Sequence, residues 1–392
     1  MALSLYYRKL FPSNLFYKWL SYGDQEYFER REFSFTLPGD IYIRYQSFSS
    51  AKEFHDSLVE NNPIKMDIGA VFQENPKDMK KRFITPQALE RELVFDIDMD
   101  DYDEVRTCCS GPAICNLCWK FILIGVEILD VALRDDFGFK NIIWVFSGRR
   151  GIHGWVADKK ARQLPPKARD AIVSYLTLIK GGNNVKRVDL GIENLHQMVS
   201  RSIGIVEKHF ENILNDQKWL ESDESLQFFI NLCGEKTLRE ELRKGITKKK
   251  PIERWRQYLR IVESFIKSKK FKTSVHHLIS EIKLQMCFPR LDAHVSRGIN
   301  HLLKAPFCIH PKTGKVCVPI DVKDLGNFDL EKVPSLAEIF SQIDKSSSSE
   351  SEEIYQSTPL LKYINIFKDF IKGCEKETIT IKREEQENNF TF

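Results

Sequence analysis

The residues best placed by type and spacing to do chemistry in this 392-residue chain are Asp96 and Asp98, in the segment 92–100. Apolar and polar side chains alternate there, which predicts a half-buried strand with both aspartates on one face, about 7 Å apart. Two carboxylates at that spacing can hold one or two divalent cations, and burial would require such a partner. The alternative is a strand end whose acids are hydrated, so a bare D-x-D needs support from other residues.

An arginine-bearing turn is the second candidate. Arg149 and Arg150 stand in the glycine-flanked segment 147–151, and His153 follows. Two planar guanidinium groups and a close backbone approach suit a triphosphate better than a single carboxylate. A tight surface hairpin with solvated arginines is the alternative.

A distant segment adds a third set of residues. Asp292 supplies another carboxylate, and Lys304 and His310 supply donors nearby in the sequence. Each of these residues alone is more often structural or solvated. In combination with the aspartate pair and the arginine turn, they match what two-metal nucleotidyl transfer needs. In that reaction one metal activates a 3′-hydroxyl, and the other holds the triphosphate and its leaving group.

Four cysteines lie within eleven residues, and Cys115 and Cys118 have the C-x-x-C spacing of a zinc knuckle. Cys108 and Cys109 are adjacent, so their thiolates must diverge to reach one ion. A closed four-sulfur zinc site would be structural, because it leaves no position open for water or substrate. Four unligated cysteines are the alternative.

Composition limits the function classes. No apolar run approaches the ~20 uncharged residues of a membrane helix, and no signal peptide is recognisable, so we expect an intracellular protein without membrane contact. With 59 basic and 55 acidic residues, nucleic-acid affinity must come from local basic patches. The lysine run 248–250 could contact a template or a partner, but the pattern favours a solvated helix terminus.

The order of elements predicts a mixed α/β fold in four parts. These are a first catalytic part over 1–182, a helical insertion over 183–280, a second catalytic part over 281–340, and a linker with a C-terminal helix and tail over 341–392. The segment 74–81 reads as a polar loop. Strands are expected at 32–37, 41–46, 64–68, 93–99, 141–146, 152–157, 286–295 and 316–322.

Seven stretches of the chain resemble the small, catalytic subunits of eukaryotic DNA primases, which belong to the archaeo-eukaryotic primase superfamily. The likeness extends from the N-terminus to about residue 325. The matching stretches are REFSFTL (31–37), DIYIRYQSF (40–48), KMDIGAVF (65–72), ELVFDIDMDDYDEVR (92–106), the CC-x5-C-x2-C cluster (108–118), WVFSGRRGIH (144–153) and CFPRLDAHVSRGINHLLKAPFCIHPKTGK (287–315).

The resemblance implies roles for individual residues. It implies that Asp96, Asp98 and Asp292 bind the catalytic Mg²⁺ or Mn²⁺, and that Cys108, Cys109, Cys115 and Cys118 bind structural Zn²⁺. The nucleotide-binding positions that it implies are Arg44, Asp67, Ser147, Arg149, Arg150, His153, His301, Lys304 and His310.

The resemblance also implies a catalytic module of two β-sheets flanked by helices. The implied reaction is template-directed, de novo synthesis of short RNA primers on single-stranded DNA from nucleoside triphosphates. The implied partners are a large primase subunit with an iron–sulfur cluster and the catalytic and accessory subunits of DNA polymerase alpha, in the nucleus. Two rival functions are a catalytically silent zinc module that holds nucleic acid and a related repair polymerase that only extends existing ends.

Overall fold

The structure is a computed structural model that describes residues 2–82, 85, 87–179, 187–268, 274–343 and 354–389. The chain forms two compact units. Unit 1 comprises Met1–Asp96, Gly138–Val173 and Asp292–Phe392, and unit 2 comprises Ile97–Phe137 and Ser174–Leu291. The predicted junction at 182/183 and most of the predicted linker lie outside the described residues, and the four-part division stays a prediction.

The first sheet of unit 1 begins with a hairpin of β1 (Arg31–Leu37) and β2 (Ile41–Gln46). The turn contains Gly39 at φ 82°, a left-handed conformation that glycine adopts without strain. β3 (Lys65–Phe72) pairs antiparallel with β1, and β4 (Ala88–Glu90) and β8 (Leu303–Lys304) pair antiparallel with β3.

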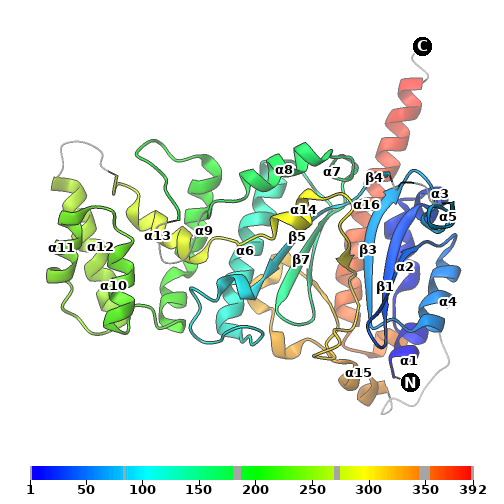
Figure 1. The fold of residues 1–392 in the computed structure, drawn as a ribbon, viewed down its shortest axis with the longest axis horizontal. Helices are drawn as coiled ribbons and strands as arrows, with labels where there is room; N and C mark the ends of the chain where they lie inside the picture. The colour runs from blue at the N-terminus through cyan, green and yellow to red at the C-terminus, as the bar shows by residue number, and fades with distance from the viewer. Residues whose placement is uncertain are drawn as a thin grey trace. The chain divides into compact units, whose positions relative to one another are not determined.

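Helices α2 and α4 lie beside this sheet (Figure 1). Phe54 of α4 lies 5.1 Å from Phe33 of β1 between ring centroids, and 6.2 Å from Phe16 of α2. These rings are almost fully buried, so they form an aromatic core under the sheet. The N-terminal helices are α1 (Ala2–Lys9), α2 (Ser13–Ser21), α3 (Gln25–Glu29) and α4 (Ala51–Asn61).

The polar loop predicted over 74–81 is wrong, because α5 (Pro76–Arg82) occupies most of that segment. Its sequence has little apolar periodicity, and Met79 is its buried anchor. The helix starts instead from local signals: Pro76 stands at its first position, and the Asn75 side chain accepts a hydrogen bond from the Lys77 amide at 2.9 Å.

The second sheet has the strand order β5-β7-β6-β9. Its strands are β5 (Leu93–Asp98), β6 (Ile142–Phe146), β7 (Gly151–Val156) and β9 (Pro319–Ile320). β6 and β7 form a tight antiparallel hairpin, and β5 lies next to β7. β1, β2, β3, β5, β6 and β7 confirm the strands expected at 32–37, 41–46, 64–68, 93–99, 141–146 and 152–157. Only two residues of the strand expected over 316–322 belong to β9.

The strand expected over 286–295 is wrong. The last two residues of α13 (Leu278–Cys287) occupy the start of that segment, and α14 (Ala293–Arg297) begins near its end. The apolar residues that resemble a strand complete the buried face of α13. Phe288 is extended because Pro289 follows it and disfavours a helical conformation.

The C-terminal part of unit 1 ends in α16 (Leu361–Asn389), which confirms the predicted C-terminal helix. Its Phe367 ring lies 5.5 Å from Phe16 and 5.6 Å from Trp19 between centroids, so its apolar face packs on α2. The remaining helices of this unit are α7 (Lys159–Arg162), α8 (Pro166–Tyr175, which ends in unit 2), η2 (Val322–Asn327), η3 (Leu330–Lys332), α15 (Leu336–Ile343) and η4 (Ile354–Ser357).

Unit 2 is helical apart from the end of β5. The described residues between 187 and 280 form helices and loops, as their pattern predicts. The helices of this unit are η1 (Met99–Tyr102), α6 (Asn116–Asp135), α9 (Gln197–Asp216), α10 (Asp223–Asn231), α11 (Lys236–Gly245), α12 (Pro251–Ser268) and α13. No helix in the described part of the chain is long and apolar enough to cross a membrane.

Candidate active site

Two aspartates from distant segments are joined through their backbones. The Asp292 amide donates a hydrogen bond to the Asp96 carbonyl at 3.0 Å, at the end of the extended segment that follows α13. Asp292 is also the N-cap of α14, where its carboxylate accepts a hydrogen bond from the His294 amide at 3.0 Å. β5 and the start of α14 therefore bring two of the three predicted acids together.

Asp98 is the last residue of β5, two positions after Asp96. The strand's alternation gives these two side chains the same face, while Phe95 and Ile97 are fully buried. The boundary between the two units falls after Asp96, so Asp98 belongs to unit 2. Its carboxylate accepts a hydrogen bond from the Asp100 amide at 3.1 Å and begins η1.

His153 faces Asp96 from the neighbouring strand β7. Its Nε2 atom lies 3.7 Å from Asp96 Oδ1, and its side chain is 9% exposed. Burial and, to a smaller extent, the positive charge of Lys304 lower the pKa of His153 to about 3. The imidazole is therefore neutral near pH 7. Its interaction with the Asp96 carboxylate is a charge–dipole contact and not an ion pair.

Lys304 connects the first sheet to the arginine turn. It lies on β8 opposite Asp67 of β3. Its ammonium donates a hydrogen bond to the carbonyl of Ser147, the first residue of the turn, at 2.5 Å. The cation is thereby held at the base of the segment that carries the two arginines.

The arginine turn is closed by two hydrogen bonds between its ends. The Ser147 amide donates to the Gly151 carbonyl at 2.9 Å, and the Gly151 amide donates to the Ser147 hydroxyl at 3.0 Å. Gly148 has φ 86°, and a Cβ atom there would lie 2.7 Å from the His310 Cβ atom. Position 148 requires glycine because its φ is positive and because a side chain would clash with His310. This close contact holds the turn against the segment that carries His310.

Arg149 and Arg150 are half-exposed and surround His310 with positive charge. Burial, together with the positive charges of Lys304, Arg149, Lys312 and Arg150, lowers the pKa of His310 to about 4. No hydrogen bond or ion pair of Arg149 occurs within the described ranges. A group of cations around a neutral histidine is suited to a ligand that carries several negative charges.

Asp67 lies at the centre of a row of polar side chains across the first sheet. Its carboxylate accepts a hydrogen bond from the Ser34 hydroxyl at 3.2 Å and pairs with Lys65 at 2.9 Å. The Tyr42 hydroxyl in turn donates to the Ser34 hydroxyl at 3.1 Å. The sequence patterns missed Lys65, Ser34 and Tyr42, because neither motif nor spacing distinguishes them from other strand residues.

Two further predicted nucleotide residues differ in their surroundings. Arg44 forms two hydrogen bonds to the buried Glu32 carboxylate, at 3.0 and 3.1 Å. His301 lies on the segment before β8, where partial burial of its ring and the charge of Arg91 lower its pKa, while Asp292 and Asp67 oppose the shift. His301 therefore lies within electrostatic range of both acids.

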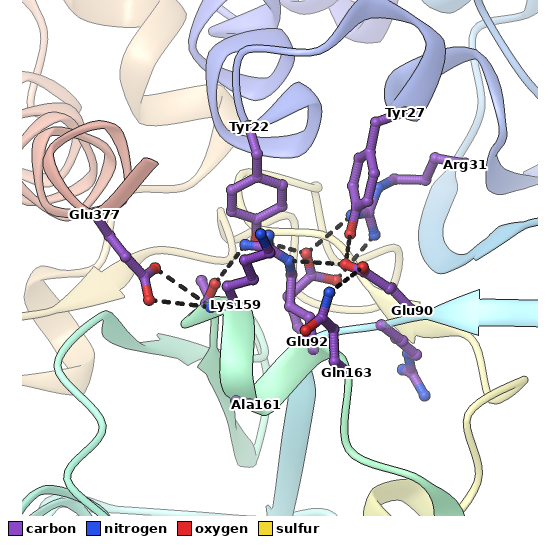
Figure 2. A network of polar contacts seen from close by, with 12 residues as sticks. Tyr22, Tyr27, Arg31, Glu90, Glu92, Lys159, Ala161, Gln163 and Glu377 are labelled. Atoms are coloured by element: carbon purple, nitrogen blue, oxygen red, sulfur yellow. Dashed lines mark hydrogen bonds and ion pairs between the residues drawn. The ribbon is translucent and has the colours of Figure 1, made fainter. Parts of the chain in front are cut away.

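A buried network at the start of β5 holds the strand that carries Asp96 (Figure 2). Glu92 precedes β5 and receives hydrogen bonds from Arg31 at 2.9 and 3.0 Å and from the Tyr22 hydroxyl at 2.6 Å. Burial alone would raise the pKa of Glu92, but the Arg31 charge outweighs it and lowers the pKa to about 2. The ion pair has no exposed side-chain surface and ties β1 to β5.

The same network reaches α16 through Glu377 (Figure 2). Its carboxylate accepts hydrogen bonds from the Lys159 amide at 3.1 Å and from the Asn141 side chain at 3.0 Å. Asn141 directly precedes β6 and Lys159 starts α7, so α16 holds both ends of the β6–β7 hairpin. In the sequence, the only indication of this network is that a charged residue, Glu92, directly precedes the apolar residues of β5.

The four clustered cysteines of unit 2 converge. The Sγ atoms of Cys108, Cys109, Cys115 and Cys118 all lie within 4.8 Å of one another. Around them, the Gln217 side chain donates to Cys108 at 3.5 Å, and the buried Arg106 guanidinium donates to Cys118 at 3.9 Å. Four sulfur donors with N–H groups around them fit a closed metal site.

The sequence of the chain is similar to proteins of one known family. A sequence model of the family "DNA primase small subunit" matches residues 95–322. The chain is 43% identical to a DNA primase small subunit of Drosophila melanogaster, over 95% of this chain and 91% of the relative. It is 39% identical to one of Caenorhabditis elegans (95% and 97%) and 38% identical to one of Schizosaccharomyces pombe (98% and 92%).

Proposed function

Because the chain belongs to the DNA primase small subunit family, whose members synthesise RNA primers for DNA replication, we propose that the acids and bases around β5 and the arginine turn carry template-directed nucleotidyl transfer. The reaction joins nucleoside triphosphates on single-stranded DNA and releases pyrophosphate. It starts without a primer. The chain is a nucleotidyltransferase.

The carboxylates of Asp96, Asp98 and Asp292 would hold two Mg²⁺ or Mn²⁺ ions. Such ions, when bound, lower the pKa of an attacking 3′-hydroxyl and stabilise the negative charge of the leaving group. The hydrogen bond between the Asp292 amide and the Asp96 carbonyl supports this role, because it keeps the two acids at one edge of the second sheet. His153 remains neutral beside Asp96 and so leaves the carboxylate charge available to a metal ion.

The cations of the arginine turn would bind the triphosphate. Arg149 and Arg150 offer planar donor groups, Lys304 adds a point charge, and His310 adds a ring nitrogen. The closed turn positions both arginines before substrate arrives, which lowers the entropic cost of binding. Asp67, Ser147, His301 and Arg44 complete the proposed nucleotide site, with Arg44 oriented by Glu32.

The proposed Zn²⁺ at Cys108, Cys109, Cys115 and Cys118 is structural, because four sulfur ligands leave no open position. We also propose that the chain acts in the nucleus with a large primase subunit that carries an iron–sulfur cluster, and with DNA polymerase alpha and its accessory subunits. The whole-chain similarity to eukaryotic primase small subunits supports these partners.

The observation that carries the proposal is the convergence of acids from two distant segments beside a fixed, arginine-bearing turn. The test incubates the full chain with bare single-stranded DNA, ribonucleoside triphosphates and Mg²⁺ or Mn²⁺. We expect dinucleotides and short RNA chains without an added primer. Products that form only on an existing end would indicate a repair-type polymerase, and no product under either condition would indicate a silent zinc module.

A further inference from the structure

A basic stretch of unit 2 covers α11, α12 and the loop between them. Residues 236–267 contain eleven Lys and Arg but only four Asp and Glu, whereas the whole chain has 59 against 55. The surplus is therefore local, and the rest of the chain is slightly acidic. We call the segment 244–250, where four lysines gather, the lysine loop.

The lysine loop presents its charges to solvent. Lys244, Lys248, Lys249 and Lys250 are all exposed. Within the described part of the chain, none of their ammonium groups has a hydrogen bond or an ion pair. A typical charged surface intersperses both signs, so four exposed lysines within seven residues and without acidic partners are available to an external anion.

The backbone of the loop is nevertheless fixed. The Gln257 side chain accepts hydrogen bonds from the Thr247 amide at 3.1 Å and the Lys248 amide at 2.9 Å. The buried Arg254 guanidinium donates to the Lys248 carbonyl at 2.9 Å and to the Leu220 carbonyl at 3.0 Å. The loop is thus preorganised, which reduces the entropy lost when its lysines bind a ligand.

The position of the lysines opposes the stability of the helix that follows them. Lys248, Lys249 and Lys250 directly precede α12, an 18-residue helix that begins at Pro251. The N-terminus of a helix is its positive end and favours acidic residues, so three cations there are unfavourable in the free protein. A bound anion would relieve that repulsion and interact with the helix dipole at the same time.

We propose that the lysine loop binds the sugar-phosphate backbone of the single-stranded DNA template. A strand carries one phosphate per nucleotide, so a row of lysines can neutralise several at once without reading sequence. Single-stranded DNA is the template of the proposed reaction, so this inference rests on the proposed function. None of its residues belongs to the proposed metal and nucleotide sites, so its contribution is to template affinity.

The test compares the full-length chain with a Lys248→Gln, Lys249→Gln, Lys250→Gln variant. Binding of fluorescently labelled oligo(dT) is measured by anisotropy over a range of salt concentrations. Each phosphate contact with a single strand contributes about 0.7 to the slope of log affinity against log salt, so three lost contacts should reduce the slope by about 2. A Lys160→Gln, Lys167→Gln, Lys376→Gln variant removes the same charge from exposed positions elsewhere and should keep the slope.

Three results would overturn the proposal. These are an unchanged salt slope in the lysine-loop variant, an equal reduction in the control variant, or equally strong competition by polyglutamate of matched charge. The last would indicate a surface for acidic proteins. Thermal unfolding and zinc content check that both variants are folded. Because binding is measured without nucleotides, the result stands even if the chain fails to synthesise RNA, so failure of the proposed function is recognised separately.

Discussion

The amide of Asp292 donates to the carbonyl of Asp96 across 3.0 Å, and this backbone bond joins the end of β5 to the start of α14. Each aspartate is also fixed within its own segment. Asp96 follows buried strand residues, and Asp292 caps a helix with its carboxylate. Backbone hydrogen bonding therefore fixes the positions from which the two carboxylates extend, which suits a site for small divalent cations.

Arg149→Ala should raise the KM for nucleoside triphosphate far more than the Kd for template. Hydrogen bonds to charged groups contribute about 1.5–3 kcal/mol, so we expect a roughly 10- to 100-fold higher KM. Steady-state kinetics and oligonucleotide binding measure the two effects. Arg8→Ala, at an exposed position in α1, is the control. Equal losses in nucleotide and template binding would contradict the triphosphate role.

Nucleotide binding should be linked to protonation of His310. In the free protein the pKa of His310 is about 4, because burial and the surrounding cations disfavour the charged ring. A bound triphosphate offsets those cations and raises this pKa, so nucleotide affinity should increase as the pH falls from 7 towards 5. Calorimetry in two buffers of different ionisation enthalpy measures the proton uptake.

That uptake should decrease in a His310→Gln variant and persist in His209→Gln, whose ring lies in unit 2. Identical proton uptake by the wild type and His310→Gln would show that another group titrates. The comparison of variants is needed because the triphosphate itself also takes up protons between pH 7 and 5, so proton uptake by the wild type does not identify His310.

Glu92→Gln should lower the free energy of unfolding by about 3–5 kcal/mol, because it leaves the fully buried Arg31 guanidinium without its counter-charge. The pKa of Glu92 is about 2 in the folded chain and 4.5 when unperturbed. Its stabilising contribution is therefore complete above pH 4.5 and is lost as the pH falls towards 2. Urea unfolding at several pH values measures both effects.

Two further variants separate this ion pair from general burial. Glu60→Gln, at an exposed position of α4, should leave stability unchanged. Replacing Arg31 and Glu92 together with methionine should recover part of the loss, since no unpaired charge remains. A Glu92→Gln variant as stable as the wild type would refute the anchoring role of the network.

Gln217→Leu should weaken zinc binding about tenfold, because its amide donates to Cys108 Sγ. Metal release to a chromogenic chelator gives the affinity, and elemental analysis of the wild type should give one zinc per chain. Gln227→Leu is the matched control, since that side chain contacts Asn231 on an exposed face of α10. Equal release rates from both variants would exclude Gln217 from the metal's surroundings.

Local patterns predicted much of the fold. The alternation around Asp96 and Asp98 predicted β5, and the spacing of the cysteines predicted a cluster that the structure brings together. In both cases the information lies within a few adjacent residues. The prediction of a strand over 286–295 was wrong because α13 ends in buried apolar residues and a proline follows them. In the sequence, such a segment resembles a short strand.

Long-range relationships could not be predicted from such patterns. No local signal places Lys304 against the Ser147 carbonyl, because β8 has only two residues and its partners come from distant segments. The same holds for Glu32, which engages Arg44, and for the hydroxyls that support Asp67. Their types are ordinary for strand residues, and only tertiary structure gives them a role.

The most direct test of the central claim is primer-free dinucleotide synthesis by Asp96→Asn and Asp292→Asn variants, with Asp56→Asn as control. Asparagine keeps the N-cap at position 292 but removes the charge. Asp56 lies on an exposed face of α4. Without a bound metal ion, the charge of the transition state loses several kcal/mol of stabilisation. The rate should therefore fall at least about a thousandfold. We predict that both variants lose synthesis while keeping their zinc content and thermal stability, and that the control retains it. Wild-type rates in either Asp96→Asn or Asp292→Asn would contradict the account.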